Sequence, residues 1–582
     1  MLTELDAYLP ADKRPSQQAL AVGLGRWLEA VFGDAVAGVS GRDAFWSSAS
    51  TRLGLQDVFD AWCFASGLAE NHSSSRFIMT ERGWLGAQIL SSLVTAKGGA
   101  VEPVDSRRAR LLAALSVAVL GGAAAIASIL LRIREFVREA PSRQLINSLP
   151  KTAHPEVWLG VNGAWEFSSR HILEPLGAHA QRTGLKVGVL LQSSIRPGKL
   201  GDAHRETSDN SAVLPVLSSA VLSGAYSRVE QVVSYSSWLQ FVAAMPGTCV
   251  AMARATFRAA TKASEVDFGL FKLSVSETPT ALVRLTTLDV LRAREAAHAT
   301  RCLVRTAKLA GGRIALSQAS LVADAVPDLI LQSGGAETLD VVHGALAEPL
   351  DMVTTARTCS TRKLLWTNSE ARYLAGQLKS VCVGAAPSRV WLPQPHSEAH
   401  QPLRVLVLSN YGTFIGSGHR RLPRLGYQEH LLDNVKGLLA RAQRKIALRW
   451  RPHPGDNRQQ VQLACSAFGP DLSLSESKRL EVDLAWADIF IASLSSTVVE
   501  ALAWERPLLI HDVPIHEAAV LMPLFDKRRR FRNVDELETA FVEATRQVDS
   551  EAPFEQEQEL RKEFFGPSGI PKPIAEFVFP RT

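Results

Sequence analysis

Hydrophobic and polar positions divide the chain into two regions with different periodicities. Up to about residue 145, apolar residues recur at helical spacing, as they do from Gln18 to Phe32 and from Gln56 to Leu68. From Val157 onward, short apolar runs alternate with helical patterns. Strands that alternate with helices are typical of parallel sheets. The pattern therefore predicts an N-terminal helical module, residues 1–150, followed by α/β structure.

The α/β region consists of two strand–helix series. The first begins with VWLGV and LKVGVLLQ and continues through DLILQSGG, LDVVHG and KLLWTNS to SVCVGAAP. After a Pro-containing connector, the second begins with LRVLVLSN, HLLDNVKGLLARAQ and IALRWRP. This repetition predicts two Rossmann-like parallel-sheet domains facing a cleft, residues 151–398 and 399–582. Ligands of such sheets bind beyond the carboxyl ends of the strands.

One segment of the helical module raises the question of membrane contact. Leu111 to Leu131 is uncharged over 21 residues, and arginines flank it on both sides. A bilayer span requires about 20 apolar residues. The segment is rich in alanine, however, and the flanking charges give no orientation. A spanning helix, a helix in the membrane plane and a buried helical hairpin all remain open.

Composition narrows the function classes. The net charge of +6 over 582 residues indicates no concentrated nucleic-acid footprint, although it suits an anionic substrate or membrane surface. The six cysteines are scattered without metal-binding spacing, which favours a reducing compartment. The N-terminus lacks a basic region followed by an apolar core, so we expect a cytoplasmic protein. No Asp-any-Asp triplet occurs in the sequence, and we expect no metal and no cofactor.

A hydroxyl-rich turn follows the predicted strand at Ile489 to Ala492. Ser495, Ser496 and Thr497 come directly before a helical pattern. Unpaired N–H groups and hydroxyls at a helix start bind phosphate. Thr497 and Glu500 also have the spacing of a capping box, which needs no ligand. Both interpretations remain open at this point.

The segment RWRPHPGD, Arg449 to Asp456, ends another strand of the second series. It places Arg451 and His453 at the carboxyl edge of the predicted sheet, within reach of a phosphate. Histidine exchanges a proton near neutral pH, which suits the departure of a phosphate, and Pro454 restricts the turn. A purely structural loop histidine is the alternative.

The order of these motifs resembles GT-B glycosyltransferases that use cytidine-nucleotide donors. His453-Pro454 is followed about 40 residues later by Ser495-Ser496-Thr497 and then by EAL and RPLL. Bacterial polysialyltransferases and sialyltransferases, capsule Kdo transferases and CDP-glycerol glycerophosphotransferases share this order. The tail with FFG also resembles these enzymes. The resemblance covers about residues 155–582 and is best from 400 onward.

The resemblance implies roles for individual residues. His453 would contact the nucleotide phosphate and assist its departure, and Ser495 and Ser496 would bind the same phosphate. His343-Gly344 resembles the His-Gly motif of the glycerophosphotransferases, with Val342 in place of Trp or Gln, so His343 is the first candidate for the base. No Asp/Glu-Asp/Glu-Gly motif of the sialyltransferases is found in the first domain, and Glu166 is the best-placed acidic alternative.

The expected function follows from the same resemblance. We expect transfer of a sugar, preferably an acidic sugar from a CMP-linked donor, to a surface polysaccharide or lipid-linked glycan of the capsule or lipopolysaccharide type. Glu500 and Asn410, which begins a Gly- and Arg-rich loop, would support the donor domain. The enzyme would act without metal at the cytoplasmic face of the inner membrane. The alternatives are transfer of a polyol phosphate from CDP-glycerol and a non-catalytic export or assembly partner.

Overall fold

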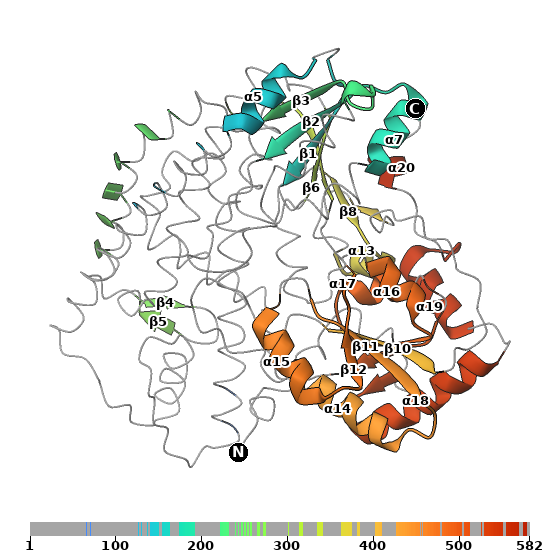
Figure 1. Cartoon of the computed structure of the whole chain (residues 1–582). Coiled ribbons are helices and arrows are strands. Elements are labelled where there is room, and N and C mark those ends of the chain that lie inside the picture. Colours follow the sequence, from blue (N-terminus) through green and yellow to red (C-terminus); the bar gives the residue numbers. More distant parts are fainter. Residues whose placement is uncertain are drawn as a thin grey trace.

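The computed structural model describes most of the second series and selected parts of the rest (Figure 1). The described residues are 140–150, 154–162, 174–192, 221–231, 265–267, 272–274, 313–317, 335–341, 362–374, 381–383, 402–409, 427–453, 456, 458–477, 480–502, 504, 506–512, 525, 529–550, 555–569 and 574–578, with isolated helical positions between 66 and 137 and between 239 and 301.

The first sheet is parallel throughout and has the order β3-β2-β1-β6-β7-β8-β9. The strand order reverses between β1 and β6, which is typical of doubly wound sheets. Its strands are β1 (Val157–Asn162), β2 (Val187–Gln192), β3 (Arg228–Gln231), β6 (Arg313–Ser317), β7 (Glu337–Val341), β8 (Arg362–Leu365) and β9 (Val381–Val383). The described helices that accompany it are α5 (Ala140–Ser148), α7 (Glu174–Thr183) and α13 (Asn368–Leu374). A separate antiparallel pair joins β4 (Glu265–Asp267) and β5 (Lys272–Ser274).

The second sheet repeats this design with the order β12-β11-β10-β13-β14-β15, again parallel. Its strands are β10 (Leu403–Leu408), β11 (Ile446–Arg451), β12 (Leu472–Leu474), β13 (Ile489–Ser493), β14 (Leu508–His511) and β15 (Arg530–Phe531). The reversal here lies between β10 and β13, the strand that precedes the hydroxyl-rich turn. The predicted α/β class with two parallel sheets is therefore confirmed.

Helices cover both faces of the second sheet. One face carries α14 (Tyr427–Arg441), α15 (Arg458–Phe468) and α18 (Val534–Asp549), and the other carries α16 (Leu480–Trp486), α17 (Ser496–Leu502) and α19 (Glu555–Phe565). Side chains of β13 alternate between the two cores, with Ile491 toward α14 and α18, and Phe490 and Ala492 toward α17. Because β13 is covered on both faces, its continuous apolar run is buried throughout.

The C-terminal segment joins the two α/β units. Phe564 and Phe565, the last residues of α19, pack in one core cluster with Trp366, which follows β8 of the first sheet. Gly566 then ends the helix with φ of 86°, a left-handed conformation that favours glycine. Helix α20 (Ile574–Val578) continues to the first sheet, where Ala575 and Val578 enter its core (Figure 1). The predicted range 399–582 thus includes a helix that packs on the first sheet.

Most of the predicted N-terminal module lies outside the described residues. Within the segment 111–131, only Ile126 and Leu130 are described, and both are helical and exposed. None of the helices in the described ranges has the length and apolar character needed to cross a membrane. The predicted strand in DLILQSGG also lies outside the described ranges.

Candidate functional site

The carboxyl edge of the second sheet carries a row of buried polar residues. Leu408 at the end of β10 pairs with Arg451 on one side and with Ala492 on the other, and Ser493 pairs with His511. The ends of β11, β10, β13 and β14 therefore lie side by side. The polar residues buried along this edge are Ser409, Ser493, Ser495, His511 and Asp512. Polar residues are mostly exposed in folded proteins, so a buried row of them is informative, and this edge is where doubly wound sheets bind ligands.

The hydroxyl-rich turn lies at the reversal point of the sheet. Helix α17 begins at Ser496, so Thr497 is inside the helix and does not occupy the N-cap position that the capping box required. The Ser495 carbonyl accepts the Val498 N–H at 3.1 Å. Ser495 itself is only 8% exposed, and its buried Oγ has no hydrogen-bond partner among the described residues. A hydroxyl left in this way costs about 1–3 kcal/mol, so the turn is not an ordinary cap stabilised by that hydroxyl.

Hydrogen bonds within the turn and from α14 hold the His453 turn in place. The His453 N–H donates to Asp456 Oδ2 at 3.0 Å, and the Asp456 N–H donates to the His453 carbonyl at 2.9 Å. Gln428, in the first turn of α14, donates Nε2 to Asp456 Oδ2 at 2.7 Å and to Ser409 Oγ at 3.3 Å. Trp450 Nε1 also donates to Ser409 Oγ, at 3.0 Å. The turn after β11 is thus tied to the end of β10 and the start of α14.

Burial sets the protonation state of His453. It lowers the pKa of the imidazole from 6.5 to about 4, so the ring is neutral at neutral pH. A neutral imidazole still donates one N–H to a phosphate oxygen. Anions nearby favour the protonated ring, so a bound phosphate would raise this pKa toward the range in which His453 transfers a proton. The sequence predicted the residue, whereas its lowered pKa follows from its burial in the folded chain.

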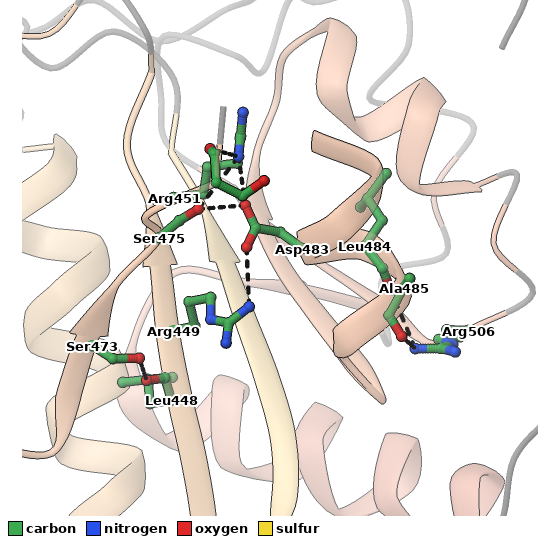
Figure 2. Close-up of polar contacts among 10 residues, drawn as sticks. Leu448, Arg449, Arg451, Ser473, Ser475, Asp483, Leu484, Ala485 and Arg506 are labelled. Atoms are coloured by element: carbon green, nitrogen blue, oxygen red, sulfur yellow. Dashed lines mark hydrogen bonds and ion pairs between the residues drawn. The ribbon is translucent and has the colours of Figure 1, made fainter. Parts of the chain in front are cut away.

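The guanidinium of Arg451 forms an ion pair and hydrogen bonds with other residues of the chain (Figure 2). Its Nη1 contacts Asp483 Oδ2, Ser475 Oγ and the Ser477 carbonyl. Asp483 is nearly inaccessible and also accepts from Arg449 Nη1 at 3.1 Å. These contacts give Arg451 a structural role between β11 and α16. Its predicted contact with a donor phosphate stays a prediction.

A pair of histidines stands beside the same edge. His430 of α14 and His511 of β14 share a hydrogen bond of 2.9 Å between Nδ1 and Nε2, so one ring donates and the other accepts. His511 also stacks on Phe531. Burial lowers the pKa of His430, and the nearby Asp433 partly opposes this. The lowered pKa favours the neutral ring of His430. The sequence pattern gave no signal for the pair because the two residues are 81 positions apart.

Several predicted residues lie outside the described ranges. They are His343, Glu166, Asn410 and Pro454. Strand β7 ends at Val341, two residues before His343, and β1 ends at Asn162, four residues before Glu166. Thr497 and Glu500 are half-buried in α17. Within the described ranges, no group of three or more His, Cys, Asp or Glu residues is arranged to hold a metal ion.

Comparisons with known proteins give only distant likenesses. No protein-family model matches the chain, and no curated protein matches it. Acinetobacter baumannii MurG is similar with 13% identity and a TM-score of 0.36, over 70% of this chain and 94% of that one. Glycosyltransferase SnogD from Streptomyces nogalater has 15% identity and a TM-score of 0.37, over 73% and 98%. A putative UDP-N-acetylglucosamine 2-epimerase from Listeria monocytogenes has 9% identity and a TM-score of 0.39, over 68% and 90%.

These similarities are too low to assign a shared activity. The names of the three proteins include a glycosyltransferase and a putative epimerase, so a likeness of this kind does not choose between reaction types. The functional proposal is therefore based on the strand order and on the chemistry of the carboxyl edge.

Proposed function

We propose that the protein is a GT-B glycosyltransferase that binds a nucleotide-sugar donor at the carboxyl edge of the second sheet. The observation that carries the proposal is the buried Ser495 hydroxyl without a partner among the described residues, at the reversal point between β10 and β13. His453 lies at the same edge, two residues after the end of β11. Two doubly wound sheets in one chain provide one unit for the donor and one for the acceptor, with the predicted cleft between them.

The proposed reaction is a displacement at the anomeric carbon of the donor. An acceptor hydroxyl attacks this carbon and loses its proton to His343 or Glu166, while the bond to the nucleotide phosphate breaks. Ser495 and Ser496 donate hydrogen bonds to the departing phosphate. His453 contributes an N–H and, once the phosphate has raised its pKa, a proton. Thr497, Glu500, Asn410 and Pro454 would shape the donor site around them.

The donor and acceptor classes rest on the order of the sequence motifs. A CMP-linked acidic sugar is the preferred donor, and a surface polysaccharide or lipid-linked glycan is the preferred acceptor. We place the reaction at the cytoplasmic face of the inner membrane, with peripheral contact. The second candidate is transfer of a polyol phosphate from CDP-glycerol, which the presence of both His343 and His453 favours. A non-catalytic assembly partner with a degenerate cleft is the remaining candidate.

Calorimetric titration of the full chain with CMP, CDP, UMP and UDP tests the donor site. We expect binding of CMP or CDP, weakened about tenfold or more by Ser495→Ala and by His453→Ala, since each change removes a phosphate contact of roughly 1.5–3 kcal/mol. Ser466→Ala is the matched control, because Ser466 is an exposed serine of α15 whose hydroxyl donates to the Gln462 carbonyl of the same helix. Selective binding of uridine nucleotides would replace the donor class, and no binding by the wild type would reject the glycosyltransferase proposal.

Products separate the two transfer reactions. Both reactions release CMP, so the nucleotide product does not distinguish them. The useful readout is whether phosphorus from the donor is found in the acceptor product. Incubation with a CMP-linked sugar should give an acceptor product without phosphorus from the donor. Incorporation of the β-phosphorus of labelled CDP-glycerol into the acceptor would instead establish polyol phosphate transfer.

A further inference from the structure

One helical segment of the first α/β unit exposes apolar side chains along a single line. It lies in the chain between β3 and β4, and its described helical positions run from Leu239 to Arg258. Leu239, Val250 and Phe257 are 45, 48 and 44% exposed. They are separated by 11 and 7 positions, about three and two turns of an α-helix, so they share one side of the helix.

The described positions of this segment that are exposed lie on the same side. They fall within an arc of about 120° at 3.6 residues per turn. Besides the three apolar residues, they are Ala243, Pro246, Gly247, Arg254 and Arg258. Val242, Ala251 and Ala253 are half-buried and lie at the two borders of the arc. Figure 1 shows these positions as short green pieces in a column on the left, away from the second sheet.

An outward apolar line reverses the usual arrangement of a surface helix. Such a helix normally turns its apolar stripe toward the core and its polar residues toward water. Here Leu239, Val250 and Phe257 lie near the middle of the outward arc. The line that they form is about 27 Å long at 1.5 Å per residue. Contiguous exposed apolar surface of this kind is typical of interaction sites.

The charges of the segment all have one sign. Between Glu230 and Glu265 the sequence contains no Asp or Glu. The charged residues of this stretch are Arg254, Arg258 and Lys262. Arg254 and Arg258 are exposed, one helical turn apart, and lie beside the apolar line. The outward face therefore combines apolar side chains with positive charge.

An anionic lipid surface matches this combination. Interfacial helices bury apolar side chains at the boundary between headgroups and acyl chains and place basic residues against the headgroups. Arginine suits this position because its apolar stem lies along the acyl chains while its guanidinium stays at the phosphates. Anionic headgroups attract Arg254 and Arg258 and would repel carboxylates, which agrees with their absence from this stretch.

We propose that the exposed side of residues 239–258, here called the docking face, lies in the plane of a bilayer and binds anionic phospholipid. The docking face is separate from the uncharged segment 111–131. The inference rests on the proposed function for the identity of the membrane and deepens it. Because the docking face belongs to the unit assigned to the acceptor, it brings that unit to the surface on which a lipid-linked glycan is held.

Flotation of the full chain with vesicles tests the proposal. The vesicles contain either phosphatidylethanolamine with phosphatidylglycerol or phosphatidylcholine alone. We expect flotation with the anionic vesicles only, and less of it at high salt because salt screens the arginines. The double change Arg254→Gln and Arg258→Gln should weaken binding at least about tenfold, since each arginine near an anionic surface contributes roughly fivefold.

The apolar line gives a second, independent readout. The double change Val250→Ser and Phe257→Ser should weaken binding at low and at high salt, because it removes buried apolar groups that salt does not screen. Leu463→Ser is the matched control, since Leu463 on α15 is 63% exposed and lies outside the docking face. It should float like the wild type.

Three outcomes would overturn the inference. One is equal flotation with both kinds of vesicle, or with neither. Another is loss of binding in Ile126→Ser with Leu130→Ser, two exposed helical positions of the segment 111–131, while the docking-face variants still bind. The third is a dimer of the wild type that the docking-face variants abolish, without vesicle binding, which would assign the face to a second copy.

Nucleotide titration of the same proteins separates this inference from the proposed function. The docking-face variants should bind CMP or CDP as the wild type does, because the donor site lies on the second sheet. Intact nucleotide binding without vesicle binding would overturn the docking face alone. Vesicle binding by a wild type that binds no nucleotide would reject the proposed function and leave the docking face in place.

Discussion

At the scale of single residues, the position of His453 was predictable and its protonation was not. The HP motif at the end of an apolar run indicated a histidine at a sheet edge, and the structure places it there. Its pKa of about 4 results from burial in the folded chain, which the motif does not reveal. The position of Ser495 was likewise predictable, but its hydrogen bonding was not. The hydroxyl pattern suggested a capping box with Thr497 as the N-cap. The structure instead begins α17 at Ser496 and leaves the Ser495 hydroxyl without a partner among the described residues.

The lowered pKa of His453 predicts proton uptake on ligand binding. Between about pH 4 and pH 6.5 the free protein keeps the ring neutral, whereas a bound phosphate anion favours the protonated ring. Binding of the nucleotide at pH 5.5 should therefore take up protons, and uptake should shrink above pH 7. Calorimetry in buffers of different ionisation enthalpy measures this number. His453→Gln should bind without this uptake, and equal uptake in both proteins would place the proton elsewhere.

The same shift predicts how stability depends on pH. The unfolded chain binds a proton at His453 below its usual pKa of 6.5, and the folded chain does so only near 4. The contribution of the neutral ring is fully present above pH 6.5 and is lost as the pH falls toward 4. Urea unfolding between pH 4.5 and 7.5 should show a weaker pH dependence in His453→Gln than in the wild type. A parallel dependence in both would assign the acid sensitivity to other groups, including His430.

Gln428 predicts a second effect at this scale. Its amide joins Asp456 of the His453 turn to Ser409 at the end of β10, so Gln428→Ala removes one hydrogen bond to a buried carboxylate and one to a buried hydroxyl. We expect a loss of about 1–3 kcal/mol in the free energy of unfolding and a shifted NMR signal of the His453 ring. Gln462→Ala, at an exposed position of α15, should change stability by less than about 0.5 kcal/mol. An unmoved His453 signal would show that Gln428 stabilises the fold without positioning the ring.

At the scale of elements, the clearest predictions were the strands with continuous apolar runs. Strands β1, β2, β10, β11, β13 and β14 lie where the pattern indicated them. Strand β6, RIALS, was missed although it pairs with β1 and β7 inside the first sheet. Its run is short and begins with arginine, so the pattern alone did not separate it from its surroundings. Strand β15 has only two residues and is recognisable through its pairing with β14.

The central strand β13 gives a test of this packing. Ile491 is fully buried in the core under α14 and α18, so Ile491→Ala removes apolar contacts and leaves a cavity. We expect a loss of about 2–5 kcal/mol in the free energy of unfolding, measured by urea denaturation. Val482→Ala is the control, because Val482 lies on α16 and is about half exposed. Equal effects of the two changes would contradict the central position of β13.

At the scale of the whole molecule, the C-terminal helix α20 packs on the first α/β unit, although the sequence pattern placed it in the second. The connector before Leu403 indicated a boundary between two domains, and the two sheets lie on either side of it. The return of α20 to the first core was not readable from the pattern. IAEFV is a short amphipathic segment, and its five residues suit either unit. Only the packing of Ala575 and Val578 assigns it to the first sheet.

The packing of α20 on the first sheet predicts that the C-terminal helix stabilises the first unit and not the nucleotide site. Val578 is completely buried near α7, so Val578→Ala should lower the unfolding free energy by about 1.5–3 kcal/mol. Val542→Ala, at a position of α18 that is about half exposed, serves as the control and should have a smaller effect. Because Ser495 and His453 both lie at the carboxyl edge of the second sheet, nucleotide affinity of the folded Val578→Ala protein should equal that of the wild type. A weaker affinity at full folding would mean that the packing of α20 is transmitted across α19 and the Trp366 cluster to the carboxyl edge, and the two units would then bind the donor as one.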